Sequence, residues 1–426
     1  MKIQIRNGRL IDPKRAIDAV QDLFVADGRI AGVGTAPGGF NADREIDASG
    51  LTVAPGLVDL SARLREPGLE YKATLDSELY AAVAGGVTSL ACPPDTDPPL
   101  DEPGLVEMLT RRASSLHLAR VYPVGALTAK LEGERLAEMA MLRHAGCIAF
   151  SQADVPIKDT MVLWRALQYA ATLGYSVWLR AQDPFVSREG VAHDGDVATR
   201  LGLPGIPAFA ETIALATILE LVRATGTTVH LCRLSTATGV DMVRRAKAEG
   251  LPVTSDVGVH HVHLSELDIG YYDAHCHLVP PLRSLRDRDA LHAGIIDGTI
   301  DAICSDHTPV DVDAKQMPFS ESGPGATALE LLLPLTLKWA QEKRVSMIEA
   351  LARVTSEPAR ILKIDAGHLG VGAPADICVF DPEEYVKVTP GTLRSQGKNT
   401  PFIGYELPGQ VRYTVVGGDV TYEAVG

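Results

Sequence analysis

The sequence lacks the features that mark membrane-spanning, secreted and disulfide-bonded proteins. No apolar run in its 426 residues reaches the ~18–20 residues that a membrane helix needs. Residues 1–4 (MKIQ) do not begin a signal-peptide pattern. The six cysteines are dispersed and form no CxxC pair, so we expect free, mostly buried thiols in a cytoplasmic protein.

Positive charge is scarce relative to negative charge. Forty Lys and Arg stand against 54 Asp and Glu, which gives a formal net charge of −14. We therefore expect neither nucleic acid nor an anionic membrane surface as a partner. A content of 46% apolar and 22% charged residues also excludes disorder, collagen and coiled coil. The length suits two or three domains, or one large barrel with a satellite.

Several sequence motifs of known chemistry are missing as well. No GxGxxG follows an early strand, and no GxxxxGK[ST] is present, so these two kinds of nucleotide site have no support. There is no GxSxG nucleophile elbow. Low-complexity segments and short-period repeats are also absent from the sequence.

Both ends of the chain contain short apolar runs separated by turn residues. Asn7-Gly8 and Asp27-Gly28 are typical hairpin turns. The pattern predicts one small β-sandwich domain, assembled from residues 1–54 and 361–426. Its expected strands are residues 2–6, 22–25, 30–34, 376–380, 411–416 and 420–422.

The middle of the chain, residues 55–360, alternates short apolar runs with helix-length segments such as 159–173 and 210–224. Eight runs at this spacing favour an α/β fold, the (β/α)₈ TIM barrel. A doubly wound open sheet is the alternative. The runs are residues 57–60, 88–92, 121–125, 147–150, 176–179, 229–231, 253–257 and 300–304.

Arginine occupies several of the positions that follow these runs, where TIM barrels place their chemistry. A guanidinium group has donors but no lone pair to offer, so it cannot ligate a metal cation. The residues therefore predict either an anion pocket or a network of ion pairs that closes the barrel mouth. They are Arg63, Arg65, Arg180 and Arg233.

Histidine and aspartate supply the other candidates. Residues 260–263 (HHVH) and 275–277 (HCH) have the density of metal-binding motifs, although we expect both in loops, where hydrogen-bonded histidines are more common. Asp306, followed by His307, is the residue best placed for a catalytic acid or base. A helix N-cap is the competing role for Asp306.

Residues 55–68 (PGLVDLSARLREPG) resemble dihydroorotase, a member of the amidohydrolase superfamily. The likeness continues in the family's order through most of the chain. The resemblance implies an amidohydrolase-type TIM barrel with a small sheet domain. The other matching segments are residues 84–88 (AGGVT), 93–98 (PPDTDP), 201–207 (LGLPGIP), 280–283 (PPLR), 298–303 (GTIDAI), 305–309 (SDHTP) and 370–377 (GVGAPADI).

Members of this family bind one or two zinc ions and interconvert dihydroorotate and carbamoyl aspartate by means of a metal-bound hydroxide. The resemblance places the proton-shuttling aspartate at Asp306, the one ligand that is kept. Serine, arginine and glutamine stand at the other positions, so we expect no functional catalytic residue, no zinc and no other cofactor. The former ligand positions are Ser61, Arg63, Gln152 (or Ala153), Arg180, Arg233 and Asp306.

The substrate-binding positions implied by the resemblance are also changed. Arg65, which in the family grips the substrate carboxylate, is present. Two asparagines are replaced by Asp95 and Val279, and a histidine is replaced by Val310. We expect the charge of Asp95 to repel an anionic substrate.

The arginines at three former ligand positions suggest a compensation. Without a metal, Asp306 would be a buried anion with a large desolvation cost. Arg63, Arg180 and Arg233 would return positive charge to the same space. We therefore expect their guanidinium groups to converge near Asp306.

The resemblance is greatest to the non-catalytic dihydroorotase homologues, or pseudo-dihydroorotases. It implies a structural subunit that assembles with the aspartate carbamoyltransferase catalytic subunit in pyrimidine biosynthesis, as a homo- or hetero-oligomer. One alternative is an active dihydroorotase or related cyclic-amide hydrolase with a relocated metal site, built from His260, His261 and Asp306. The other is a small-anion sensor that uses the cationic mouth.

Overall fold

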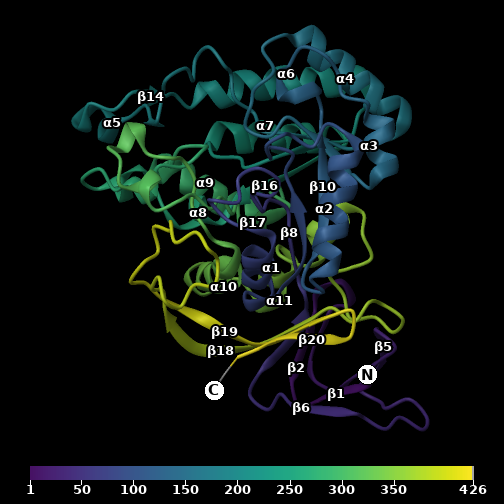
Figure 1. The fold of residues 1–426 in the computed structure, drawn as a ribbon. Helices are drawn as coiled ribbons and strands as arrows, with labels where there is room; N and C mark the ends of the chain where they lie inside the picture. The colour runs from purple at the N-terminus through teal and green to yellow at the C-terminus, as the bar shows by residue number, and fades with distance from the viewer. Residues whose placement is uncertain (425–426) are drawn as a thin grey trace.

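A barrel of eight parallel strands forms the larger part of the computed structural model, which describes residues 1–424 (Figure 1). The strands lie side by side in chain order, and each expected run overlaps one of them. Arg63 N donates to His307 O (2.9 Å), and His307 N donates to Ser61 O (3.0 Å), which joins the chain after the first strand to the chain after the last. The fold is therefore the predicted barrel and not the open sheet. The strands are β8 (Leu57–Asp59), β9 (Val87–Cys92), β10 (Arg120–Ala126), β11 (Ala149–Ser151), β12 (Val177–Leu179), β15 (Val229–Leu231), β16 (Val253–Gly258) and β17 (Ala302–Cys304).

The barrel strands are continuous apolar runs because both of their faces are covered. Every residue of β8, β9 and β17 is buried, as expected for parallel strands between a filled interior and a ring of helices. Inside the barrel, Val58, Ala91, Val124 and Trp178 belong to one apolar cluster. This packing holds the strand ends, and the side chains that follow them, in fixed positions.

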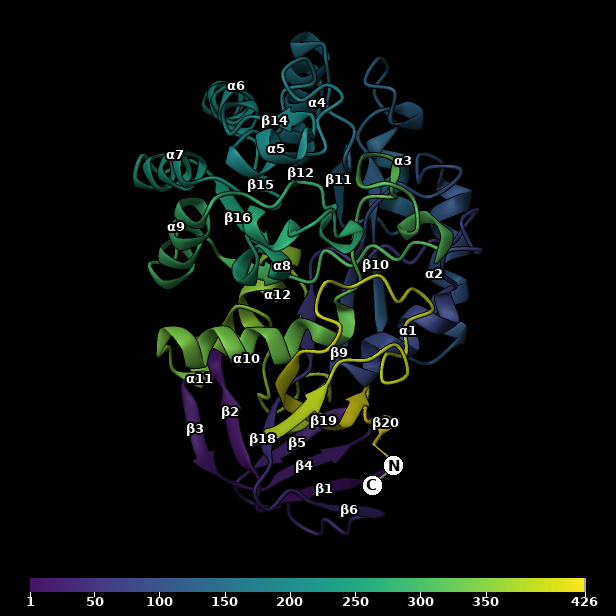
Figure 2. The same cartoon turned by 90° about the vertical axis from the view of Figure 1, so that its left-hand side faces the viewer.

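Helices cover the outside of the barrel (Figures 1 and 2). The helix expected at 159–173 is α4 (Thr160–Leu173), where the Asp159 side chain accepts a hydrogen bond from Met161 N and Gly174 ends the helix at a φ of +67°. The other expected helix is α6 (Phe209–Thr225). The remaining helices are α1 (Leu75–Ala84), α2 (Pro103–Ser115), α3 (Met139–Ala145), α5 (Asp196–Leu201), α7 (Ala237–Ala248), α8 (Val259–His263), α9 (Leu285–Ile296), α10 (Leu332–Lys343), α11 (Met347–Ala352) and α12 (Ser356–Leu362).

Short 3₁₀ turns connect several of these elements, and a two-stranded pair lies apart from the barrel sheet. The pair is formed by β13 (Ala192–His193) and β14 (Gly205–Ile206). The 3₁₀ turns are η1 (Pro13–Arg15), η2 (Ala129–Leu131), η3 (Glu266–Ile269), η4 (Ala274–Cys276), η5 (Asp313–Lys315), η6 (Phe319–Glu321) and η7 (Leu329–Leu331).

The two ends of the chain meet below the barrel in a second domain, where purple and yellow strands lie together (Figures 1 and 2). Its six-stranded sheet pairs β7 (Thr52–Pro55) with β18 (Ile377–Lys387), which pairs in turn with β19 (Glu406–Val416). The order is β20-β19-β18-β7-β2-β3. The remaining strands of this sheet are β2 (Arg9–Asp12), β3 (Ile17–Val20) and β20 (Asp419–Glu423).

A four-stranded sheet packs against the six-stranded one. Ile5 of the smaller sheet shares an apolar cluster with Val53 and Ile377 of the larger, so the two sheets form the expected sandwich. Asp27 and Gly28 both have positive φ values, 52° and 74°, which is the backbone of a tight two-residue hairpin. The strands of this sheet are β1 (Ile3–Arg6), β4 (Leu23–Ala26), β5 (Arg29–Val33) and β6 (Arg44–Asp47).

Helix α10 lies between the barrel and the sheet domain, in contact with α8 and β19 (Figure 2). The expected domain limits at 54/55 and 360/361 fall within β7 and α12, and those limits remain a prediction. All six cysteines are free, and five of them are buried. Within residues 1–424, none of the helices combines the length and the apolar character of a membrane span.

Candidate functional site

Three guanidinium groups converge on one carboxylate at the mouth of the barrel. Arg63 Nη2 lies 2.6 Å from Asp154 Oδ2, and Arg180 Nε lies 2.6 Å from Asp154 Oδ1. Arg233 Nη2 also donates to Asp154 Oδ1. The arginines follow β8, β12 and β15, and Asp154 follows β11, so four strand ends contribute to the cluster.

The carboxylate that follows strand four in this cluster belongs to Asp154, two residues beyond the expected former ligand position Gln152. Gln152 turns to the barrel wall, where its amide accepts from Thr128 Oγ1 (2.9 Å) and donates to Leu131 O (2.7 Å). Ala153 has a positive φ of 50°, and Asp154 follows it into the site. The available sequence signal was the excess of arginine at strand ends, because three buried cations require anions nearby.

Asp306 lies at the inner side of the same cluster. Its Oδ1 accepts from Arg233 Nη1 (2.9 Å) and from Arg63 Nη1 (3.3 Å). The three guanidinium groups converge, as expected. The carboxylate that all three contact is that of Asp154, however, and not that of Asp306. The competing role of Asp306 as a helix N-cap is wrong, since the next helical turn after it is η5, which begins at Asp313.

Asp95 contributes a third carboxylate, with its Oδ2 accepting from Arg63 Nε at 2.7 Å. Three arginines thus meet three aspartates, and the cluster is neutral overall. The expected repulsion of an anionic substrate by Asp95 is reduced accordingly, because its charge is already paired. Of the two sequence alternatives for the arginines, this geometry is an ion-pair network around Arg63, Arg180 and Arg233.

The other former substrate positions face the protein itself. Val279 O accepts from Arg233 Nη1 (3.3 Å), and Val310 N donates to Asn399 Oδ1 (3.1 Å). Arg65 donates from Nε to Pro309 O at 2.9 Å. Within residues 1–424, Arg65 has no carboxylate in ion-pair range, which distinguishes it from the three clustered arginines.

The electrostatics of the cluster differ from residue to residue. Burial alone raises the pKa of Asp154, but Arg233, Arg63 and Arg180 outweigh it and hold that pKa well below its usual range. Burial raises the pKa of Asp306, against the opposing effect of Arg233 and Arg63. Asp154 is therefore the firmly ionised partner of the network.

Four residues of the site have positive φ values although none of them is glycine. Arg65, Ala153, Arg233 and Asp306 have φ values of 65°, 50°, 55° and 46°. Such left-handed conformations cost on the order of 1–3 kcal/mol each and occur where the surrounding structure enforces them. Arg233 and Asp306 are thus held in position by the fold as well as by their ion pair.

The pKa of buried Arg65 shifts in the opposite direction to that of Arg63. Burial, and then the nearby Arg63 charge, lower the pKa of Arg65 to about 10. The Arg63 pKa is raised instead, because Asp95 and Asp154 outweigh the effect of burial. Arg65 is consequently a buried cation of the mouth, without a carboxylate partner, that an external anion would stabilise.

The histidine-rich motifs do not come together around these residues. Residues 260–263 form most of α8 and not the expected loop. His261 Nε2 lies 3.0 Å from Pro280 O, and His263 Nε2 lies 2.9 Å from Leu335 O. Burial lowers the pKa of both rings to about 4, so they are neutral hydrogen-bonding groups.

The remaining histidine candidates also have protein partners. His277 Nδ1 lies 2.9 Å from Ser322 Oγ. His307, which follows Asp306, places its Nε2 2.6 Å from Glu78 Oε2. Neither histidine belongs to a metal-binding cluster within residues 1–424.

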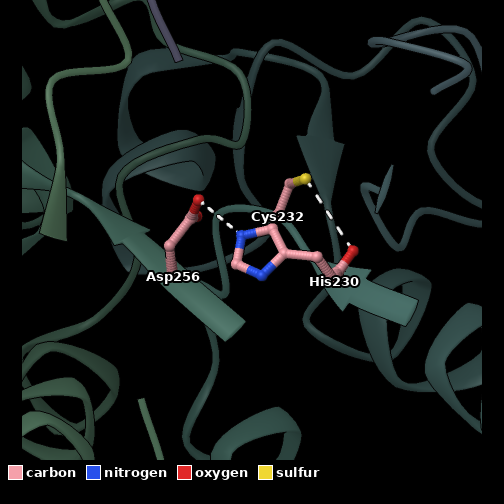
Figure 3. A group of neighbouring side chains, drawn as sticks. All are labelled: His230, Cys232 and Asp256. Atoms are coloured by element: carbon pink, nitrogen blue, oxygen red, sulfur yellow. Dashed lines mark hydrogen bonds and ion pairs between the residues drawn. The ribbon is translucent and has the colours of Figure 1, made fainter. Parts of the chain in front are cut away.

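Elsewhere in the barrel interior, three potential metal ligands lie close together: His230, Cys232 and Asp256 (Figure 3). Their ligand atoms all lie within 4.8 Å of one another, and this is the one such group within the described chain. Sequence reasoning missed it because the three residues lie in and after strands that were interpreted only as apolar runs. By contrast, the former ligand positions hold guanidinium groups and do not fit a cation.

Comparisons with known proteins assign the chain to a family. The profile described as "Dihydro-orotase-like" matches residues 50–239, and "Amidohydrolase family" matches residues 188–422. A dihydroorotase-like protein of Pseudomonas putida is 46% identical over 422 residues, 99% of each chain. Its Pseudomonas aeruginosa counterpart is 44% identical over 99% of this chain and 100% of its own. A dihydroorotase of Geobacter sp. is 40% identical over 100% of both.

Solved structures confirm the fold. The L-hydantoinase (dihydropyrimidinase) of Arthrobacter aurescens superposes with a TM-score of 0.88 at 24% identity, over 99% of this chain and 96% of that one. The dihydropyrimidinase of Brevibacillus agri gives 0.83 at 20% identity, over 99% and 95%. The predicted TIM barrel with an added sheet domain is therefore correct.

The same family matches contradict the expectation that the protein has no cofactor. Amidohydrolases are typically zinc-dependent, and relatives that match over the full length are named dihydroorotase. The chemistry of the side chains restricts only the place of a metal, because arginine cannot ligate it whereas His230, Cys232 and Asp256 can. By its profile matches and its full-length identity, the chain belongs to the dihydroorotase-like amidohydrolase family.

Proposed function

We propose that this protein is a dihydroorotase homologue without dihydroorotase turnover, which serves in the cytoplasm as an assembly subunit for the aspartate carbamoyltransferase catalytic subunit in pyrimidine biosynthesis. The observation that carries the absence of turnover is the state of Asp306. Its Oδ1 is held by Arg233 Nη1 at 2.9 Å and by Arg63 Nη1 at 3.3 Å. Both arginines stand at former metal-ligand positions, where a guanidinium group cannot hold the metal that would supply the hydroxide nucleophile.

The space in front of Asp306 is also filled by the protein's own ion pairs. Arg63 and Arg233 both extend from Asp306 to Asp154, so a substrate atom that approached Asp306 would have to break contacts at two carboxylates. Breaking a buried, hydrogen-bonded charge pair costs on the order of 3–5 kcal/mol. This cost favours a site that is maintained for stability over one that is opened in each catalytic cycle.

The partner and the oligomeric state rest on the family resemblance. Relatives of similar identity carry both kinds of name, dihydroorotase-like protein and dihydroorotase, so overall identity does not separate a subunit from an enzyme. The arginines at former ligand positions are what favour the subunit. We propose a mixed oligomer with aspartate carbamoyltransferase as the physiological form.

The first test is an assay of ring opening and ring closure with the purified full chain. Zn²⁺, Co²⁺ and Mn²⁺ are supplied in turn, and the 40% identical Geobacter dihydroorotase serves as the positive control. We expect no rate above the buffer blank with any metal. Turnover that depends on this chain would refute the proposal that it lacks activity.

The second test addresses assembly. The chain is mixed with the aspartate carbamoyltransferase of the same organism, and the mass of the complex is measured by light scattering. We expect one complex, with carbamoyltransferase activity or assembly that depends on this chain. Two independent species with unchanged activity would exclude the assembly role, whatever the outcome of the first test.

A second candidate function, carboxylate binding, is favoured by Arg65. Its guanidinium is buried, and its Nε donates to the carbonyl of Pro309 (2.9 Å) instead of to a carboxylate. Carbamoyl aspartate and dihydroorotate are suitable probes, each compared with phosphate in a thermal-shift experiment. Stabilisation by the carboxylates that is lost in Arg65→Met supports this candidate, and the absence of any shift excludes it.

A further inference from the structure

Two neighbouring barrel strands bring an imidazole, a thiol and a carboxylate together (Figure 3). His230 is the second residue of β15, and Cys232, two residues after His230 and directly after the strand, lies on the same face. Asp256 lies on β16, which pairs with β15 in parallel. His230 Nε2 and Asp256 Oδ2 are 2.9 Å apart, and Cys232 Sγ completes a group of ligand atoms within 4.8 Å.

Outer contacts aim two of these groups at the common centre. His230 Nδ1 lies 2.8 Å from Thr254 Oγ1, which fixes the ring with Nε2 toward Asp256. Asp256 Oδ1 accepts from Arg233 N at 2.6 Å, which leaves Oδ2 for the centre. Histidine and carboxylate ligands in metal sites are oriented by hydrogen bonds of this kind.

Unfilled space adjoins the ligand atoms. Cys232 and Asp256 line a cavity of about 30 Å³, together with Trp178, Arg63 and Arg233. Its volume exceeds the ~10–15 Å³ needed for one water molecule. Trp178 Nε1 is buried and lacks a hydrogen-bond acceptor within residues 1–424. A water molecule in this cavity would have polar neighbours and would lie next to Cys232 and Asp256.

The charges of the region also accommodate a dication. The guanidinium groups of Arg63 and Arg233 also line this cavity, and both are already ion-paired with aspartates of the cluster. A neutral imidazole, a carboxylate and a thiolate carry a total of −2, which a divalent cation neutralises. Thiolate and imidazole are ligands that favour zinc over magnesium or calcium.

We propose that His230, Cys232 and Asp256 bind Zn²⁺, with water in the adjoining cavity as a fourth ligand. On binding, the Cys232 S–H bond ionises and its proton passes to solvent. The hydrogen bond between His230 Nε2 and Asp256 Oδ2 is replaced by one coordination bond from each residue. The imidazole stays neutral, with its one proton on Nδ1, where it donates to Thr254 Oγ1. The site stands apart from the proposed function, and either holds without the other.

The test uses Co²⁺ as a spectroscopic substitute for Zn²⁺ on the full-length protein after removal of metal by a chelator. A tetrahedral site with one cysteine gives intense visible bands and a near-ultraviolet thiolate-to-cobalt charge-transfer band. We expect one Co²⁺ per chain, displaced by Zn²⁺. The absence of cobalt uptake, or uptake without the charge-transfer band, would overturn the proposal.

Variants locate the metal. Cys232→Ser is expected to lose the charge-transfer band, and Cys304→Ser, another buried cysteine of the barrel interior, is the matched control that keeps it. Thr254→Val removes only the outer contact to His230 and should weaken cobalt binding by about 10–100-fold. A band that persists in Cys232→Ser contradicts the assignment.

A measurement on the unaltered protein guards against variants that fail to fold. X-ray absorption at the zinc edge of the loaded protein should show one sulfur at about 2.3 Å and nitrogen or oxygen atoms at about 2.0–2.2 Å. A first shell without sulfur excludes Cys232 as a ligand, and the proposal with it.

Discussion

Arg180 Nε lies 2.6 Å from Asp154 Oδ1, and the two residues follow neighbouring strands, β12 and β11. The pair is part of a larger network because Asp154 also binds Arg63 and Arg233. Asp154 is therefore the residue on which the barrel mouth depends most. Its removal leaves three buried guanidinium groups with two carboxylates.

Replacement of this central aspartate should destabilise the protein strongly. We expect Asp154→Ala to lower the free energy of unfolding by about 2–4 kcal/mol, since an uncompensated buried charge remains. The matched control is Asp18→Ala, because the Asp18 side chain is similarly exposed (35% against 31%) but pairs with Arg9 alone. The control should cost at most about 1 kcal/mol, with both values measured by urea unfolding. Equal effects would show that the network adds nothing to an ordinary surface pair.

The sequence predicted the frame of this site but not its centre. All eight strands were expected because buried parallel strands are continuous apolar runs. The arginines were expected at the mouth because they follow those runs directly. Asp154 was missed because the chain turns through a left-handed conformation at Ala153, so the carboxylate lies one position beyond the residues that were considered.

Two other features depended on information that a single sequence does not contain. The helix at 259–263 has five residues and no side-chain cap, too short for a helical period to be recognised. His230 and Asp256 meet because β15 and β16 pair in a particular register, in which His230 lies opposite Thr254. The sequence shows that His230 and Cys232 are two residues apart and so share one face of a strand. It does not show that β16 pairs with this strand and supplies Asp256.

The network should also show coupling between its members. In Arg180→Met, Asp154 keeps two guanidinium partners, so we expect a smaller loss of stability than in Asp154→Ala. The double variant, Asp154→Ala with Arg180→Met, no longer contains an Arg180 without its partner. Its loss of unfolding free energy should therefore be smaller than the sum of the two single losses by about 1–3 kcal/mol. A double-mutant cycle by urea unfolding measures this difference. Additive losses would mean that Arg180 and Asp154 act independently.

Stability should fall as the pH falls from about 6.5 to 4, and His263 should contribute to the slope. Burial lowers the pKa of His263 from the usual 6.5 of a histidine to about 4. A lowered folded-state pKa means that the unfolded chain binds the proton first, so the stabilisation is complete above pH 6.5 and is lost as the pH falls toward 4. For a shift of this size the loss is on the order of 3 kcal/mol.

Urea unfolding at several pH values tests this expectation in His263→Gln. The variant should lose stability less steeply than the unaltered protein between pH 6.5 and 4, by about one proton's contribution to the slope. His144→Gln is the control, since His144 is exposed on α3, and its slope should match the unaltered protein. An unchanged slope in His263→Gln would mean that His263 is protonated equally in both states.

Gly68 controls the position of the loop that carries Asp95. A Cβ atom at Gly68 would lie 1.7 Å from Asp97 O, and its φ is +89°, so Gly68→Ala must displace the 93–98 loop. We expect a loss of about 3–5 kcal/mol. The control, Gly174→Ala, has a similar positive φ of +67° with open space around it, and should lose about 1–2 kcal/mol for the backbone alone.

A second measurement ties this steric effect to the site. If the displaced loop withdraws Asp95 from Arg63, then Asp95→Asn should destabilise the Gly68→Ala variant less than it destabilises the unaltered protein, because the 2.7 Å ion pair is already weakened. The same substitution in the Gly174→Ala background should keep its full effect, since Gly174 ends α4 far along the chain from the loop. Equal effects of Asp95→Asn in all three backgrounds would show that the loop relaxes without moving Asp95.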